Sequence, residues 1–154
     1  MINLRKFTGG LFCVTCILLG GAFFLLYVPV FYCLEVRDLD NPQKSVLFDC
    51  GPKKEFIISY THSVNKGRVK DCYSISDDGD IRLNKTIFVS YGAGIPEPED
   101  SQTFIITENG LEIQNINRNF KTFLMAVGVE AKHAIEIDDQ IYYLEKFFLP
   151  KTSL

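Results

Sequence analysis

The chain has 154 residues with 16 basic and 19 acidic side chains, so its formal net charge is −3. This length predicts a single domain, and the acidic balance, without a basic groove or stripe, argues against nucleic acid as a partner. The apolar residues are unevenly distributed, because the 28 residues from Phe7 to Leu34 include no charged side chain.

This uncharged run predicts a membrane anchor, since about 20 apolar residues suffice for a helix to cross a bilayer. Arg5 and Lys6 precede the run and Glu35 follows it, which by the positive-inside rule puts the N-terminus in the cytoplasm. The run is longer than the core of a cleaved signal peptide and ends without a small-residue cleavage pattern. We therefore expect a single-pass protein of the cytoplasmic (inner) membrane, with residues 1–6 inside and an uncleaved anchor at residues 7–34.

The remaining chain is expected on the periplasmic or extracellular side, and it carries all 19 acidic residues and 14 of the 16 basic ones, a net charge of −5. Three cysteines lie in or beside the anchor, where they act as small apolar residues. Cys50 and Cys72 lie in the outer domain, where a disulfide is permitted. Sequence spacing leaves open whether they pair or stay as free thiols.

The outer part is expected to consist of a polar connector at residues 35–44, a β domain at residues 45–148 and a tail at residues 149–154. Within the domain, apolar residues alternate with a period of two, which predicts strands, and turns rich in Gly, Pro and Asn separate them. The expected strands are residues 45–50, 55–62, 69–75, 81–91, 103–107, 111–113, 122–129, 133–137 and 141–144. Lys85 interrupts the alternation of the fourth, which indicates a bulge or an exposed edge.

Eight or nine short strands at regular spacing, with no segment of helical period, predict an all-β domain. We expect an antiparallel β-sandwich or barrel, preceded by one transmembrane helix.

The two histidines both fall in register with apolar residues. His62 continues the alternation of Phe56, Ile58 and Tyr60, and His133 that of Ile135 and Ile137. With Asp71, they would make a metal or anion site if the strands brought them together, although zinc usually takes three protein ligands at recognisable spacings. The alternative is two histidines at the edge of the core, each hydrogen-bonded to the backbone.

Ser63 raises the question of a hydrolase. Because adjacent strand residues point in opposite directions, His62 is badly placed to activate Ser63, and His133 would have to act as the base with Asp71 orienting it. No Gly-x-Ser-x-Gly elbow is present. The other interpretation is that the Ser63 hydroxyl shapes the turn through a hydrogen bond.

The segment Tyr91-Gly92-Ala93-Gly94-Ile95-Pro96 follows a predicted strand. Glycine permits positive φ and close approach of the backbone, and successive exposed amides can cradle an anion. The alternative is a tight turn made rigid by Pro96. Tyr91, Gly92, Gly94 and Pro96 are therefore candidate residues for binding a ligand or a partner.

Two elements together resemble a family of uncharacterised bacterial and archaeal domains whose genes often lie beside those of TAXI-type tripartite (TRAP) solute transporters. The elements are His62-Ser63-Val64 with Asp71 after it, and Gly92-Ala93-Gly94-Ile95-Pro96; His133 fits the later histidine of the pattern. The resemblance covers roughly Cys50 to Leu144. Arg68 stands where the family commonly has proline, and Asp71 is shorter than the usual glutamate.

The resemblance implies a place in the membrane transport of small organic solutes. We therefore expect a membrane-anchored accessory subunit of such a transporter, which acts by protein–protein contact with the transporter membrane subunit or with its solute-binding protein. The expected contact residues are His62, Ser63, Asp71, Tyr91, Gly92, Gly94, Pro96 and His133. The alternatives are a small-ligand or metal-binding module and, third, a serine hydrolase; no cofactor is expected.

Overall fold

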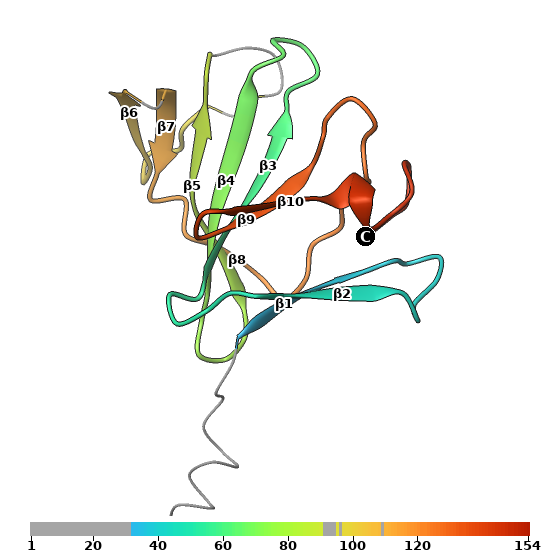
Figure 1. The fold of residues 1–154 in the computed structure, drawn as a ribbon. Coiled ribbons are helices and arrows are strands. Elements are labelled where there is room, and N and C mark those ends of the chain that lie inside the picture. Colours follow the sequence, from blue (N-terminus) through green and yellow to red (C-terminus); the bar gives the residue numbers. More distant parts are fainter. Residues whose placement is uncertain (1–31, 91–94, 96, 109) are drawn as a thin grey trace, which may run out of the picture. The chain divides into compact units, whose positions relative to one another are not determined.

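The computed structural model describes residues 32–90, 95, 97–108 and 110–154, and ten strands are its main secondary structure (Figure 1). They are β1 (Cys33–Arg37), β2 (Ser45–Asp49), β3 (Glu55–Thr61), β4 (Arg68–Ile75), β5 (Ile81–Phe88), β6 (Thr103–Thr107), β7 (Gly110–Gln114), β8 (Arg118–Phe120), β9 (Ala134–Ile137) and β10 (Gln140–Tyr143). One turn of 3-10 helix follows at Leu144–Lys146.

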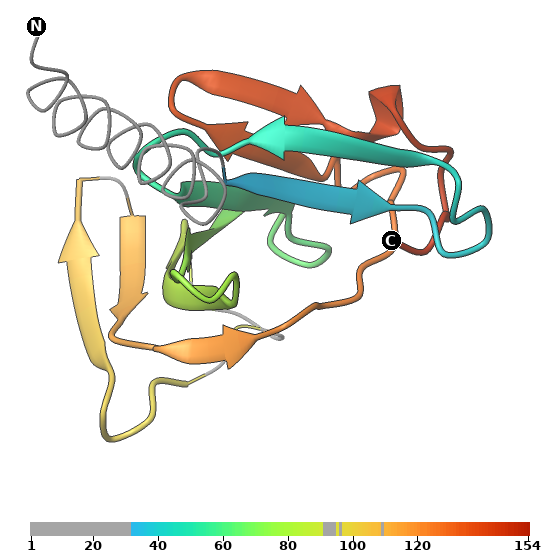
Figure 2. The same ribbon diagram turned by 90° about the horizontal axis from the view of Figure 1, so that it is seen from below.

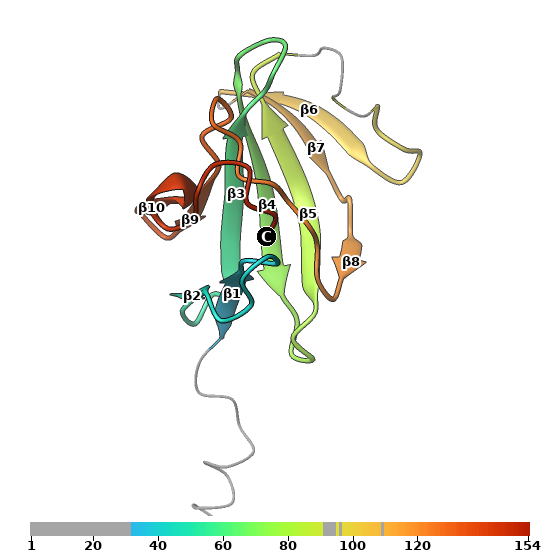
Figure 3. The same ribbon diagram turned by 90° about the vertical axis from the view of Figure 1, so that its right-hand side faces the viewer.

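Every strand pair in this described part is antiparallel, which confirms the all-β antiparallel prediction. The larger sheet has the order β10-β9-β3-β4-β5-β7-β6, with β8 also paired to β5, and β1 and β2 form a separate hairpin. Within the described residues β6 and β10 end the larger sheet and do not pair with each other, so the sheet does not close on itself. Figure 3 shows β6 and β7 above β8 at one side of the sheet.

The tight turns expected from the sequence join these strands. Gly79 adopts φ +86° between β4 and β5, and Gly110 adopts φ +128° at the start of β7. A Cβ on Gly110 would lie 2.7 Å from the carbonyl oxygen of Phe88. Only glycine therefore lets the β6–β7 hairpin approach β5 this closely.

A bulge divides β5, close to the predicted interruption at Lys85. Cys72 pairs with Lys85 and Tyr73 pairs with Leu83, so Asn84 is the extra residue. The first half of β5 pairs with β8 and the second half with β7.

The core-facing side of the larger sheet carries two separate apolar clusters. The larger one surrounds Phe56, Ile58, Tyr73 and Ile135, and the β1–β2 hairpin contributes Leu34 and Phe48 to it. The ring of Phe48 lies 5.2 Å from that of Tyr142, and Figure 2 shows the hairpin beside β9 and β10. The smaller cluster is built on three residues, each 1% exposed: Val69, Phe88 and Ile113.

The predicted boundary between anchor and connector is wrong. Cys33 and Leu34, assigned to the anchor, and Glu35 to Arg37, assigned to the connector, form β1. Leu34 is 8% exposed because it packs into the larger core cluster. The rest of the predicted anchor lies outside the described residues, and among those that the structure describes no helix is long and apolar enough to cross a membrane.

The expected tail and the expected strand at residues 122–129 are also corrected. Residues 122–129 form no strand; the segment makes one bridge, between Ala126 and Ser153. Met125 and Leu154 exchange two backbone hydrogen bonds, of 3.0 and 2.7 Å. Leu154 is 7% exposed in the core, so the C-terminal segment is part of the fold rather than a free tail.

Cys50 and Cys72 are both free thiols. Cys50 is buried in the larger cluster. Cys72 pairs with Ile57, and so lies on the face of the sheet opposite Phe56, Ile58 and Tyr73. The sheet itself separates the two sulfur atoms, and the disulfide is not formed.

Candidate functional site

His62 shapes the turn between β3 and β4. Its Nδ1 accepts a hydrogen bond from the backbone N–H of Val64 at 3.3 Å, and its own backbone pairs with Gly67 and Lys66. The side chain is only 7% exposed. Ser63, next to it, is exposed, as expected for a neighbour pointing the other way.

His133 plays a matching part in the loop before β9. Its Nδ1 accepts the backbone N–H of Gly128 at 3.1 Å, and its ring lies 5.6 Å from the ring of Tyr60. Burial, and secondarily the charge of Arg68, lower the pKa of His133. Both histidines are thus backbone-bonded residues at the edge of the core, one of the two alternatives that the sequence left open.

Arg68 fixes the same loop from the other face of the sheet. Its guanidinium donates to the carbonyl of Lys132 at 2.9 Å and to the hydroxyl of Ser59 at 2.7 Å. The backbone N–H of Thr61 donates to the carbonyl of Ala131 at 2.6 Å. The loop is therefore anchored to β3 and β4 by several independent bonds.

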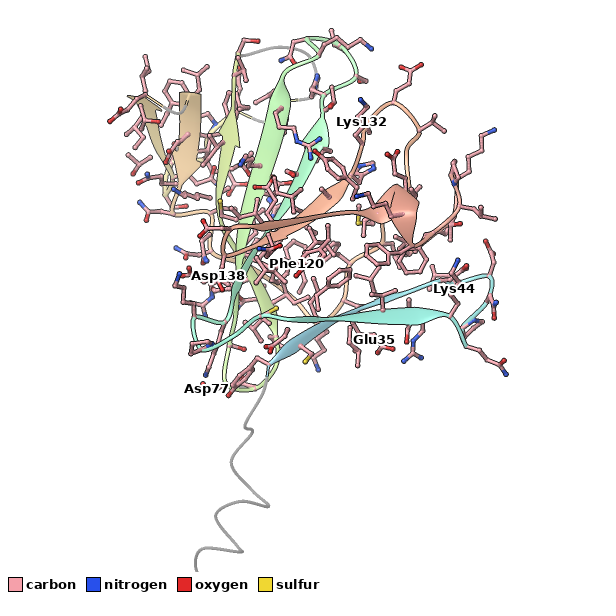
Figure 4. The ribbon with its side chains drawn as sticks, in the orientation of Figure 1. Glu35, Lys44, Asp77, Phe120, Lys132 and Asp138 are labelled. Atoms are coloured by element: carbon pink, nitrogen blue, oxygen red, sulfur yellow. The ribbon has the colours of Figure 1, made fainter. Side chains whose placement is uncertain are left out.

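These contacts bring three loops together at one end of the sheet, which we call the tip: residues 62–67, 89–90 and 128–133. The amide of Asn65 donates to the carbonyl of Ser90 at 2.9 Å, and Lys66 lies 3.7 Å from Glu130. Figure 1 shows the turn between β3 and β4 at the same end of the sheet as the end of β5, and Figure 4 labels Lys132 there.

Three valines of the tip or its border are exposed: Val64 at 63%, Val89 at 62% and Val129 at 59%. Gly67 supports their spacing, because a Cβ on it would lie 3.1 Å from the Cβ of Val89. The tip therefore presents apolar side chains on loops that are held in place by partly buried and exposed hydrogen bonds.

Asp71 lies on β4, farther from the tip than Arg68 and between the two apolar clusters. It pairs with Ile58 on β3 and with Thr86 on β5, whose hydroxyl donates to Asp71 Oδ1 at 2.7 Å. Burial raises the pKa of Asp71, and the Thr86 bond only partly opposes that rise. A carboxyl group in such a setting is a candidate functional group.

The metal site considered from the sequence is not assembled. Nowhere in the part of the chain that the structure describes do three or more His, Cys, Asp or Glu side chains gather closely enough to hold a metal ion. His62, Asp71 and His133 each bond elsewhere, to Val64, Thr86 and Gly128 respectively.

The serine-hydrolase arrangement is likewise not formed among these described residues. Asp71 bonds to Thr86 and not to His133, and His133 Nδ1 is occupied by a backbone N–H. Ser63 has no side-chain hydrogen bond to either of them.

Tyr91, Gly92, Gly94 and Pro96 lie outside the described residues. Ile95, within the same segment, packs against the smaller apolar cluster together with Tyr60. Ile95 therefore packs against the same cluster as Tyr60, whose ring lies next to that of His133.

Sequence reasoning missed Tyr60, Thr86 and the structural role of Arg68. Tyr60 carries a detectable signal in the sequence, since it shares the alternation of His62. Thr86 could not be found in this way, because its partnership with Asp71 depends on the register shift at Asn84.

The opposite face of the sheet carries an open groove of about 510 Å³. It is lined by residues of β3, β4, β5 and β7, among them Cys72, Lys85 and Gln114. Burial raises the pKa of the Cys72 thiol to about 11, so the sulfur stays protonated at neutral pH. None of the predicted site residues lines this groove.

Residues 56–144, which run from the start of β3 to Leu144, match the model of one family, described as a domain of unknown function (DUF1850). The chain belongs to the DUF1850 family. The DUF1850 region contains His62, Asp71 and His133, the smaller apolar cluster and part of the larger one, but not the β1–β2 hairpin. No curated protein and no solved structure matches the chain significantly.

Proposed function

We propose that this protein is a membrane-anchored accessory subunit of a TAXI-type tripartite (TRAP) solute transporter. It acts by protein–protein contact through its outer β domain, and the uncharged N-terminal run serves as a transmembrane helix in the cytoplasmic membrane. In this proposal the domain is a small sandwich, with the β1–β2 hairpin covering one face of the larger sheet. The partner at the tip is the transporter membrane subunit.

The exposed valines of the tip carry this proposal. Val64, Val89 and Val129 are each about 60% exposed, on loops that the bonds of His62, His133 and Arg68 hold in place. Pre-ordered loops lower the entropy cost of association, and apolar side chains with a charged rim are typical of a protein interface.

The charges around these valines fit the same purpose. Lys66, Glu130 and Lys132 border the apolar side chains. Rim charges of both signs contribute more to the choice of partner and to the rate of association than to affinity.

The test is co-purification of the tagged full chain from native membranes in mild detergent, followed by mass spectrometry. We expect the transporter membrane subunit at a near-equal amount. In Val64→Asp and Val89→Asp chains we expect recovery of that subunit to fall at least tenfold, because each change puts a charge into the apolar contact.

Leu47→Asp is the matched control, because Leu47 on β2 is 65% exposed and lies on the hairpin away from the tip. It should leave recovery unchanged. A wild-type chain that purifies alone, or a Leu47→Asp loss as large as that of Val64→Asp, would contradict the proposal.

A further inference from the structure

The two apolar clusters of the core-facing side are separated by polar groups of β4 and β5. Asp71 and Thr86 are directly paired across these strands, with the smaller cluster on one side and the larger on the other. Asp71 is partly exposed rather than sealed in the core. Asp71 is therefore reachable from solvent, with an apolar cluster on each side of it.

Within the described residues no cation neutralises the carboxylate of Asp71. The basic residues nearest to it on β4 are Arg68 and Lys70, which point to the opposite face. Arg68 bonds to Ser59 and Lys132, and Lys70 forms an ion pair with Glu136 at 2.8 Å. A partly desolvated carboxylate without a cationic partner costs stability, so the charge of Asp71 is available to a positively charged ligand.

Two tyrosines lie near Asp71 in the register of the sheet. Tyr60 and Tyr73 lie on the same core-facing side as Asp71. Tyr73 is two residues farther along β4, and Tyr60 is the diagonal neighbour of Asp71 on β3. Burial, with the charge of Asp71 added, raises the pKa of Tyr60 to about 12 and raises that of Tyr73 as well. Both hydroxyls therefore stay neutral beside the carboxylate.

These groups leave several acceptor positions open. The Thr86 hydroxyl uses its proton on Asp71 Oδ1, so its oxygen lone pairs and Asp71 Oδ2 remain. The tyrosine oxygens make no hydrogen bond to any described residue, and they too can accept. A protonated primary amine offers three N–H donors and one positive charge in a compact group. The free carboxylate oxygen of Asp71 can accept from it and balance its charge, and the neutral hydroxyl oxygens can accept the remaining N–H groups.

We propose that Asp71, Thr86, Tyr60 and Tyr73 form a binding site for the protonated primary amino group of a small organic molecule. Its apolar part rests against the smaller cluster, beside Tyr60 and Ile95. This site is separate from the tip contact and does not depend on it. A calcium or magnesium ion fits less well, because such ions require more oxygen ligands and usually more carboxylates.

The experiment uses the full chain in detergent with n-butylammonium chloride as the probe. Binding is followed by the near-ultraviolet circular dichroism of the tyrosines and by the thermal midpoint, against sodium chloride at the same ionic strength. We expect a saturable response to butylammonium, and none to tetramethylammonium, which has the charge but no N–H donor. The affinity should fall as the pH is lowered through the raised pKa of Asp71, because protonation removes the charge that holds the amine.

Asp71→Asn should weaken butylammonium binding at least tenfold, because it removes the charge while an amide oxygen can still accept from Thr86. Tyr60→Phe should weaken it severalfold and keeps the ring contact with His133. Asp100→Asn, at an exposed carboxylate, is the control and should change nothing. An equal response to tetramethylammonium or sodium, or a wild-type response in Asp71→Asn, would overturn the proposal; if Asp71→Asn does not fold, the tetramethylammonium comparison and Tyr60→Phe decide it.

Discussion

Replacing His133 by alanine tests whether the histidine holds the tip through its unprotonated Nδ1. The change removes the acceptor for the Gly128 N–H and the ring contact with Tyr60. A half-buried backbone N–H left without a partner costs about 1 kcal/mol, and an aromatic contact is worth about another 1 kcal/mol. We therefore expect a loss of about 2 kcal/mol, which for a domain of this size lowers the thermal midpoint by about 8 °C.

The loss should depend on pH, because the folded pKa of His133 lies below that of the unfolded chain. The unfolded histidine has a pKa of about 6.5, so the unfolded state binds more protons as the pH falls below that value. The stability contributed by neutral His133 is present above pH 6.5 and is lost as the pH falls through the folded pKa. The difference between wild type and His133→Ala should therefore be largest at pH 7.5 and shrink towards pH 5.

The assay is thermal unfolding of the full chain in detergent, followed by tyrosine circular dichroism because the chain has no tryptophan. Lys121→Ala, at an exposed position, is the control for the substitution itself. A midpoint shift under about 2 °C, or a shift of the same size at pH 7.5 and pH 5, would refute this account of His133.

Two further substitutions test the packing. Gly110→Ala should lower the thermal midpoint more than Gly79→Ala. Both glycines have positive φ, so both substitutions strain the backbone. A Cβ at Gly110 would also clash with the Phe88 carbonyl, whereas a Cβ at Gly79 would meet nothing within 4 Å. Equal midpoints for the two variants would argue against the close approach of β7 to β5. Leu154→Ala should cost about 2 kcal/mol or more because the side chain is buried in the larger cluster; urea unfolding measures this, with exposed Leu124→Ala as the control, and an unchanged midpoint would mean that the C-terminal segment is free.

Most of the strands could be predicted from sequence because their apolar residues alternate and glycine or aspartate turns bound them. β3 and β4 are clear cases, with Phe56 and Ile58 paired against Tyr73 and Asp71 in the expected phase. The prediction of a strand at residues 122–129 was wrong, because Phe123 and Val127 pack into the core without a neighbouring strand. An apolar run by itself does not distinguish such a segment from a central strand.

β1 was missed for a related reason. Cys33 and Leu34 continue an uncharged segment, so composition gives no sign of where the run ends and the hairpin with β2 begins. Burial of Leu34 against residues distant in sequence decides that boundary.

The sequence predicted which residues belong to the candidate site better than it predicted how they are arranged. The phase of His62 and His133 indicated side chains near the core, and both are there, but the choice between a shared ligand and separate backbone bonds depends on loop geometry. Gly128 and Val64 supply the donors. The partnership of Asp71 with Thr86 depends on a register shift that no local pattern specifies.

The bulge at Asn84 separates two sets of strand amides that are protected from solvent deuterium by different neighbours. Before it, β5 pairs with β8 beside the larger cluster, and after it β5 pairs with β7 over the smaller one. Because local opening follows cooperative packing units, the β6–β7 hairpin and the end of β5 can exchange their amide hydrogens together while β3, β9 and the larger cluster stay closed. We therefore expect the β6–β7 hairpin, which packs beside the smaller cluster, to open without unfolding the rest of the domain.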